Sequence, residues 1–140
     1  RVRFNRYEVM SVVAVKVEKD KITIGADSIL VSGWTQEKDK LAKLNEINGM
    51  VIGDVGDAQE GALFLMYCKT RKPRAASVED LVEFMSEFQD WMSKKVDISK
   101  LENQYVIILN GKAFMMEGFF IKEVTYYTAI GAGMDYALSA

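Results

Sequence analysis

The stretch that decides the fold is MSVVAVKVEKDKITIGAD, Met10–Asp27. Its two halves, Ser11–Val17 and Lys21–Ala26, are rich in β-branched residues and flank the polar segment Glu18–Asp20. Such a pattern is typical of two strands joined by a tight turn. The stretch therefore predicts a β-hairpin near the start of the chain.

The register of this hairpin brings two polar residue types together. Antiparallel partners are placed symmetrically about their turn, so Ser11 is expected opposite Asp27 or Ser28. A hydroxyl and a carboxylate then meet at one edge of the sheet. Ser11 can be a nucleophile or an ordinary strand residue, and the hairpin alone does not distinguish the two.

Composition indicates one ordinary domain. The chain has 140 residues, of which 49% are hydrophobic, enough to bury a real core. Its longest apolar runs, such as Tyr105–Leu109 and Ala62–Met66, fall far short of the roughly 20 residues that a membrane span requires. A net charge of -2 and the lack of a basic stripe with interleaved aromatics argue against nucleic acid as a partner.

The cysteine and histidine counts exclude several chemistries. The single cysteine, Cys68, allows no internal disulfide and no multi-cysteine zinc site, which favours a reducing, cytoplasmic location. Its place in a helical run predicts a buried, unreactive side chain. With no histidine, the chain has no Ser-His-Asp or Cys-His catalysis and no histidine metal site. A nucleophile here needs another base, either a lysine or a free α-amino group.

After the first hairpin, the sequence predicts a second one and then two helices. Lys40–Leu44 and Gly49–Ile52 have the pattern of paired strands turned at Asn45–Gly49. A glycine turn leads into a helix over Asp57–Arg71, whose first residue complements the positive end of the helix dipole. Ser77 is the expected N-cap of the next helix.

That second helix has an apolar face, and strands follow it. Apolar side chains recur at helical spacing and are expected in the core: Val78, Leu81, Val82, Met85, Phe88 and Met92. Further strands are expected over Asn103–Leu109, Ala113–Glu117, Gly118–Ile121 and Val124–Ile130, with Asn110-Gly111 as a type I′ turn. Gly131-Ala132-Gly133 is expected to lead into a helix. Runs of strands and runs of helices predict an α+β fold with antiparallel sheets.

Several motifs in order resemble those of the proteasome β-subunit group of N-terminal nucleophile (Ntn) hydrolases. The strand MSVVAV, Met10–Val15, resembles the amino-terminal strand of that family, and Gly25-Ala26-Asp27 resembles the end of its second strand. KLAKL, Lys40–Leu44, resembles its lysine strand, and GDVGDAQ, Gly53–Gln59, its glycine turn. Arg71-Lys72-Pro73 and Ala129–Gly133 also match the pattern, so the similarity covers Met10 to about Ala140.

The resemblance implies a fold and a chemistry. The fold is a four-layer α-β-β-α sandwich with two antiparallel sheets. The chemistry is peptide hydrolysis by an N-terminal hydroxyl whose own α-amine accepts the proton, with no cofactor and no metal. Carried over by motif, the catalytic residues are Ser11, Asp27, Lys40 and Gly53, with Lys43 as a rival lysine. Ser11 is the nucleophile, Lys40 activates it by its charge, Asp27 holds that lysine, and the Gly53 N–H stabilises the oxyanion.

Further expectations concern the substrate pocket and the ends of the chain. Val51 and Val55 would line the pocket and favour an apolar side chain before the cleaved bond. Residues 1–9 are expected to be a leader, a processed remnant or an expression-derived segment, and residues 10–140 a single proteasome-like domain lacking the C-terminal part of the family. Removal of Met10 would expose Ser11, because serine is small enough for ordinary methionine excision. Ala132 stands where many members of the family carry a serine.

Three functions remain open at this point. The first is an ATP-independent peptidase subunit that acts through Ser11 within a homo-oligomeric ring, on peptides or unfolded protein. An ATPase unfoldase is a further partner that the resemblance admits. The second is an inactive structural subunit of such a ring. The third is a small-amide amidohydrolase, since one fold hosts several chemistries.

Overall fold

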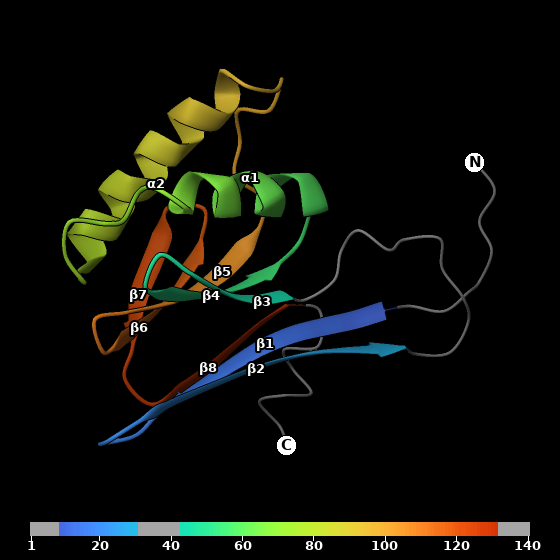
Figure 1. Cartoon of the computed structure of the whole chain (residues 1–140). Coiled ribbons are helices and arrows are strands. Elements are labelled where there is room, and N and C mark those ends of the chain that lie inside the picture. The colour runs from blue at the N-terminus through green and yellow to red at the C-terminus, as the bar shows by residue number, and fades with distance from the viewer. Residues whose placement is uncertain (1–8, 31–42, 132–140) are drawn as a thin grey trace.

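The computed structural model describes residues 9–30 and 43–131, which form eight strands and two helices. Four strands precede the helices and four follow them, as the sequence predicts (Figure 1). The first four strands are β1 (Val9–Val17), β2 (Ile22–Leu30), β3 (Lys43–Ile47) and β4 (Met50–Val55). The helices are α1 (Ala58–Cys68) and α2 (Val78–Ser93). The last four strands are β5 (Gln104–Leu109), β6 (Lys112–Glu117), β7 (Phe120–Val124) and β8 (Tyr127–Gly131).

The strands form two antiparallel sheets. One has the order β2-β1-β8 and the other the order β3-β4-β5-β6-β7. Both helices lie on the face of the five-stranded sheet that points away from the three-stranded sheet (Figure 1). The predicted α+β class with two antiparallel sheets is therefore confirmed. The described residues supply three layers, α, β and β, of the predicted four.

The first hairpin has the predicted turn and one of its two predicted registers. Ser11 pairs with Ser28, and Asp27 pairs with Val12. β2 continues to Leu30, beyond the predicted strand end at Ala26. Pairing with β1 explains this extension, since the ladder continues to Val9 opposite Leu30.

The second hairpin turns later than predicted. The sequence analysis placed the turn at Asn45–Gly49, but β3 runs through Ile47 and only two residues, Asn48 and Gly49, form the turn. Both have positive φ, 53° and 78°, as a type I′ turn requires. The predicted type I′ turn at Asn110-Gly111 is confirmed by φ values of 51° and 76°.

The other element boundaries need smaller corrections. α1 ends at Cys68, three residues before the predicted Arg71. The predicted strand Gly118–Ile121 is wrong in its first half, because Gly118 has φ 59° and belongs to the turn between β6 and β7. The helix expected after Gly131-Ala132-Gly133 lies outside the described residues.

Both helix starts are capped by a side chain: Ser77 caps α2 as predicted, whereas Asp57, predicted as the first residue of its helix, is the N-cap of α1. Asp57 is the N-cap of α1, and its carboxylate accepts a hydrogen bond of 2.9 Å from the Glu60 N–H. Ser77 is the N-cap of α2 and accepts from the Asp80 N–H at 3.2 Å. These caps satisfy N–H groups that have no partner within the helix.

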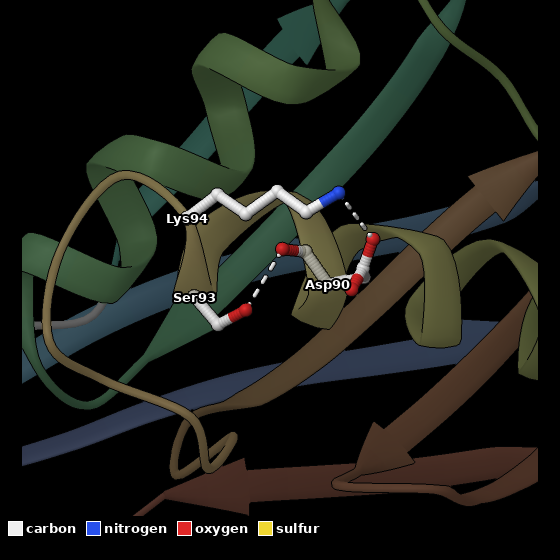
Figure 2. Close-up of polar contacts among 3 residues, drawn as sticks. All are labelled: Asp90, Ser93 and Lys94. Carbon is white, nitrogen blue, oxygen red and sulfur yellow. Dashed lines mark hydrogen bonds and ion pairs between the residues drawn. The ribbon is translucent and has the colours of Figure 1, made fainter.

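The C-terminal turn of α2 carries local contacts at the surface (Figure 2). The Ser93 hydroxyl donates to the Asp90 carbonyl oxygen at 2.9 Å, and Lys94 Nζ lies 3.2 Å from the Asp90 carboxylate. Both charged side chains are about 70% exposed, so the ion pair adds little to stability.

Two hydrophobic clusters hold the layers together. Between the helices and the five-stranded sheet, Phe64, Phe88 and Tyr105 are fully buried, and the Phe64 ring contacts each of the other two. The predicted core positions of α2 are confirmed, because Leu81, Met85, Phe88 and Met92 lie in this cluster. Between the sheets, a smaller cluster is built of Val13, Val15, Val55, Val106, Ala113, Val124 and Ile130.

Cys68 belongs to the larger cluster and has no exposed surface. Burial raises the pKa of its thiol to about 12, so the side chain stays neutral at physiological pH. The predicted buried cysteine is confirmed. Among the described helices, none is both long and apolar enough to cross a membrane.

Candidate functional site

Gly53 of β4 and Val13 of β1 are in close contact between the two sheets. A Cβ on Gly53 would lie 2.5 Å from Val13 Cγ1, far inside normal contact. Val13 has no exposed surface and stands two residues after Ser11. The missing side chain at Gly53 therefore lets the strand that carries Ser11 pack directly onto β4.

The register of the first hairpin places Ser11 and Asp27 on different faces. Residues directly opposite each other in a ladder share a face, and faces alternate along a strand. Position 11 therefore shares the face of Val13, which packs against the other sheet, whereas position 27 shares the face of Val12. The register does not bring Asp27 to the side of Ser11 that faces Gly53.

Of the two candidate lysines, Lys40 lies outside the described residues. Lys43 begins β3 and pairs with Asp54, while Leu44 pairs with Gly53. Asp54 lies on the helix side of the sheet, where its carboxylate contacts α1 at Gly61. Position 43 therefore belongs to the helix side, and Gly53 to the side that faces β1.

Gly53 also has strand neighbours on both sides. It pairs with Leu44 of β3 and with Val106 of β5. In a strand with neighbours on both sides, the N–H of each residue donates a hydrogen bond to one neighbouring strand or the other. An oxyanion role for the Gly53 N–H therefore requires a substrate to replace a ladder partner.

Val51 and Val55 share the face of Gly53 because they stand two residues before and after it in β4. Val55 is buried in the cluster between the sheets. Val51 is only half-buried. The two valines thus line one apolar face toward β1, and Val51 is the more accessible of them.

The sequence analysis missed a cluster of buried polar side chains on the helix side of Gly53. Asp54, Glu60 and Asn103 are each at most 4% exposed. The Asn103 amide accepts from the Asp57 N–H at 2.7 Å and donates to the Asp57 carbonyl oxygen at 2.9 Å. It also lies 3.4 Å from the Asp54 carboxylate. Asn103 therefore fixes the turn between β4 and α1 through both backbone groups of Asp57.

Glu60 connects the same turn to the start of β5. Its carboxylate accepts from the Glu102 N–H at 2.7 Å, from the Asn103 N–H at 3.2 Å and from the Tyr105 hydroxyl at 2.8 Å. Burial, followed by the neighbouring charges of Glu60 and Asp54, raises the pKa of Tyr105 well above its ordinary value. The tyrosine therefore stays a hydrogen-bond donor across the working pH range.

Two glycines make room for this cluster. A Cβ on Gly56 would lie 2.3 Å from Asn103 Oδ1, and one on Gly61 would lie 2.3 Å from Asp54 Oδ2. The GDVGDAQEG sequence predicts a sharp turn, but nothing local in it shows that the carboxylates are buried. Within residues 9–30 and 43–131, no three His, Cys, Asp or Glu side chains gather as a metal site would require.

A hydrogen bond joins the two sheets beside this turn. The Gln104 side-chain oxygen, on β5, accepts from the Gly131 N–H at the end of β8 at 3.0 Å. Gly131 pairs with Val12, the residue after Ser11. The start of β1, the end of β8 and the turn after β4 are thus linked through Asn103 and Gln104.

Two solved structures of BPH from Thiobacillus denitrificans share this fold. The structure of BPH in complex with epoxomicin has a TM-score of 0.70 and 15% sequence identity, covering 92% of this chain and 76% of that chain. A second structure of BPH has a TM-score of 0.69 and 16% identity with the same coverage. No family model matches the sequence, and no curated protein matches it. The likeness extends over nearly all of this chain and establishes a shared fold.

Proposed function

We propose that the chain is a peptidase subunit of the N-terminal nucleophile type, with Ser11 as its nucleophile. The observation that carries this proposal is the packing of Val13 onto Gly53. It brings the strand that begins beside Ser11 against the glycine turn, two motifs that are far apart in sequence. The fold shared with BPH, which has been solved in complex with the proteasome inhibitor epoxomicin, supports the same chemistry.

In the proposed reaction the Ser11 hydroxyl oxygen attacks the carbonyl carbon of a peptide bond. The free α-amine of Ser11 takes the hydroxyl proton and passes it to the leaving amine. Water then hydrolyses the resulting ester and regenerates the hydroxyl. Neither a histidine nor a metal is needed, consistent with a chain that has no histidine.

The supporting roles go to residues on three segments. Lys40 supplies a positive charge that favours the ionised nucleophile. Asp27 is proposed to hold that lysine, although its position lies on the face of Val12 and not on that of Ser11. We prefer Lys40 to Lys43 because position 43 lies on the helix side of the five-stranded sheet, away from β1. Gly53 contributes its backbone N–H to the developing oxyanion when the substrate replaces a ladder partner.

The substrate proposed is a peptide or an unfolded segment with an apolar side chain before the cleaved bond. Val51, half-buried on the face of Gly53, supplies the apolar contact for this side chain. Val55, buried on the same face, forms the deeper part of the pocket. We also propose that the subunit acts within a homo-oligomeric ring. An ATPase that unfolds substrates is its proposed partner, and the cytoplasm its proposed location.

The test begins with protein expressed from Met10. Methionine excision should leave Ser11 as the N-terminus, which intact-mass measurement shows directly. Fluorogenic peptides with apolar residues before the reporter should then be hydrolysed, and epoxomicin should add its mass to the chain.

Two variants make the test specific. Ser11→Ala should abolish both hydrolysis and the epoxomicin adduct, and Ser11→Thr should retain both. Retention of Met10, or turnover that survives Ser11→Ala, would overturn the proposal. An inactive wild type that forms rings by light scattering would instead indicate a structural ring subunit, and a single-chain mass would count against the ring.

A further inference from the structure

We propose that Gln104 is a positioning residue, which holds the end of β8 and thereby the start of β1 in the place that Ser11 needs. The catalytic part of this inference rests on the proposed function. Its structural part, a tether between the sheets, does not. The tether is the hydrogen bond from the Gly131 N–H to the Gln104 side chain.

The hydrogen bond satisfies a backbone group at the edge of a sheet. In the order β2-β1-β8, β8 has a strand neighbour on one side only among the described residues. The Gly131 N–H at its end donates to Gln104 Oε1 at 3.0 Å. A side chain from the other sheet thus bonds an N–H for which residues 9–30 and 43–131 supply no strand partner on that side.

Gly131 is suited to this geometry. Its φ is 111°, in a region that L side chains rarely adopt and that glycine adopts without strain. The backbone bends there at the point where the ladder with β1 ends, opposite Val12. The bend and the tether therefore lie directly beside the residue that follows Ser11.

The strand that carries Gln104 is itself held firmly. Asn103 precedes it, with its N–H bonded to Glu60 and its side chain bonded to both backbone groups of Asp57. Gln104 pairs with Val55 in β4 and with Glu117 in β6. Consecutive strand residues point to opposite faces, so Asn103 holds the turn after β4 while Gln104 holds β8.

This arrangement predicts a specific kinetic effect. Without the tether, the end of β8 and the paired start of β1 lose a fixed position relative to Gly53. Displacement of a nucleophile by about 1 Å costs up to about a hundredfold in rate. The apolar face of Val51 and Val55 belongs to β4 and stays in place. We therefore expect kcat to fall about 10- to 100-fold while KM changes less than about threefold.

The experiment compares two substitutions of similar length. Gln104→Met removes the acceptor, whereas Gln104→Glu keeps a carboxylate oxygen that can accept from the same N–H. Gln89→Leu is the matched control, because the Gln89 amide also bonds a backbone group, the Ser99 carbonyl oxygen, but from α2, on the helix face of the five-stranded sheet and not between the two sheets (Figure 1). All three are measured in the protein expressed from Met10, with Ser11 as its N-terminus after methionine excision.

Two readouts separate the tether from its catalytic consequence. Hydrogen exchange of the Gly131 amide should accelerate at least about tenfold in Gln104→Met and stay near the wild-type rate in Gln104→Glu and Gln89→Leu. The drop in kcat should follow the same pattern.

Unchanged exchange in Gln104→Met would overturn the tether. Faster exchange with unchanged kcat would overturn the positioning role. A wild type that hydrolyses no peptide would overturn the proposed function and its catalytic consequence, while the exchange result would still decide the tether.

Discussion

The contact between Gly53 and Val13 predicts that a single methyl group at position 53 damages the packing of the two sheets. In Gly53→Ala the new Cβ would lie 2.5 Å from Val13 Cγ1, about 1 Å closer than ordinary carbon contacts. Val13 is fully buried among Val15, Val55 and Ile130, so it has little room to rotate away. The strands must separate or the valine must leave its rotamer.

The size of the effect follows from this overlap. Overpacking of a buried contact costs about 1–3 kcal/mol. We expect Gly53→Ala to lower the free energy of unfolding by about 2 kcal/mol, and Tm by roughly 6–10 °C. Urea unfolding followed by circular dichroism measures the first, and a thermal scan measures the second.

A double-mutant cycle tests the cause. Val13→Ala alone should cost about 2 kcal/mol, because it removes buried methyl groups. Combined with Gly53→Ala it should cost no more, since the clashing atom is gone, giving a coupling of about 2 kcal/mol.

Gly25→Ala is the control, because no atom lies within 4 Å of the Cβ position of this β2 glycine. It should change stability by less than about 0.5 kcal/mol. Additive costs in the cycle, or an equal cost at Gly25, would refute the contact as the reason for glycine at position 53.

Three further outcomes are expected. Asn103→Leu should lower the free energy of unfolding by about 2 kcal/mol in urea titration, because the half-buried Asp57 N–H loses its acceptor and the Asp57 C=O keeps only the Gly61 N–H as donor; a loss below about 0.5 kcal/mol would contradict this reasoning. Tyr105→Phe should cost about 1–2 kcal/mol in the same assay, because the buried Glu60 carboxylate loses a donor at 2.8 Å, and no loss would show that the carboxylate needs no tyrosine donor. The Cys68 thiol has an ordinary pKa of 9.0 in the unfolded chain and about 12 in the folded one, so only the unfolded state ionises between these values. The contribution of the Cys68 thiol to the free energy of unfolding is therefore complete below pH 9 and falls by about 1.4 kcal/mol per pH unit above it. Cys68→Ala should remove this part of the pH dependence when unfolding is measured from about pH 8 to 11, and an unchanged pH dependence would contradict the prediction.

Much of the fold could be predicted from local patterns. The β-branched run from Ser11 and the polar segment after Val17 are enough to predict β1, its turn and two alternative registers, of which the structure has the one that pairs Ser11 with Ser28. Asn110-Gly111 identified its turn because both positions need positive φ. The same signal was present at Asn48-Gly49. The predicted turn of that hairpin begins too early because Asn45 and Glu46 are polar, as turn residues often are, although they belong to β3.

The buried polar cluster could not be predicted in this way. Asp54 and Glu60 flank a glycine turn in the sequence, where carboxylates are usually solvated. Their partners Asn103 and Tyr105 lie 45 to 49 residues away along the chain. Only the pairing of β4 with β5 brings these side chains together, and no local period encodes that pairing. Likewise, a half-buried glutamine at position 104 has no pattern that distinguishes it from a surface residue.

The candidate site lies between these two cases. Ser11, Asp27 and Lys40 come from motif resemblance, and they stay predictions. The site roles of Gly53 and Val55 also stay predictions, but the structure shows what each residue contacts. Gly53 lacks a side chain because Val13 occupies its place, and Val55 is part of the layer between the sheets. In each case the reason is a contact across sheets, which only the assembled fold contains.

The position of β1 in the middle of its sheet has a consequence for folding on the ribosome. β2 is made soon after β1, but β8, the other neighbour of β1, is made near the far end of the described chain. Until β8 emerges, one edge of the β1–β2 hairpin has unpaired N–H and C=O groups, and such an edge invites pairing with another chain. Contacts between distant segments also form slowly, because a long loop must close first. The edge of β1 that pairs with β8 therefore stays exposed until residues 127–131 have been synthesised.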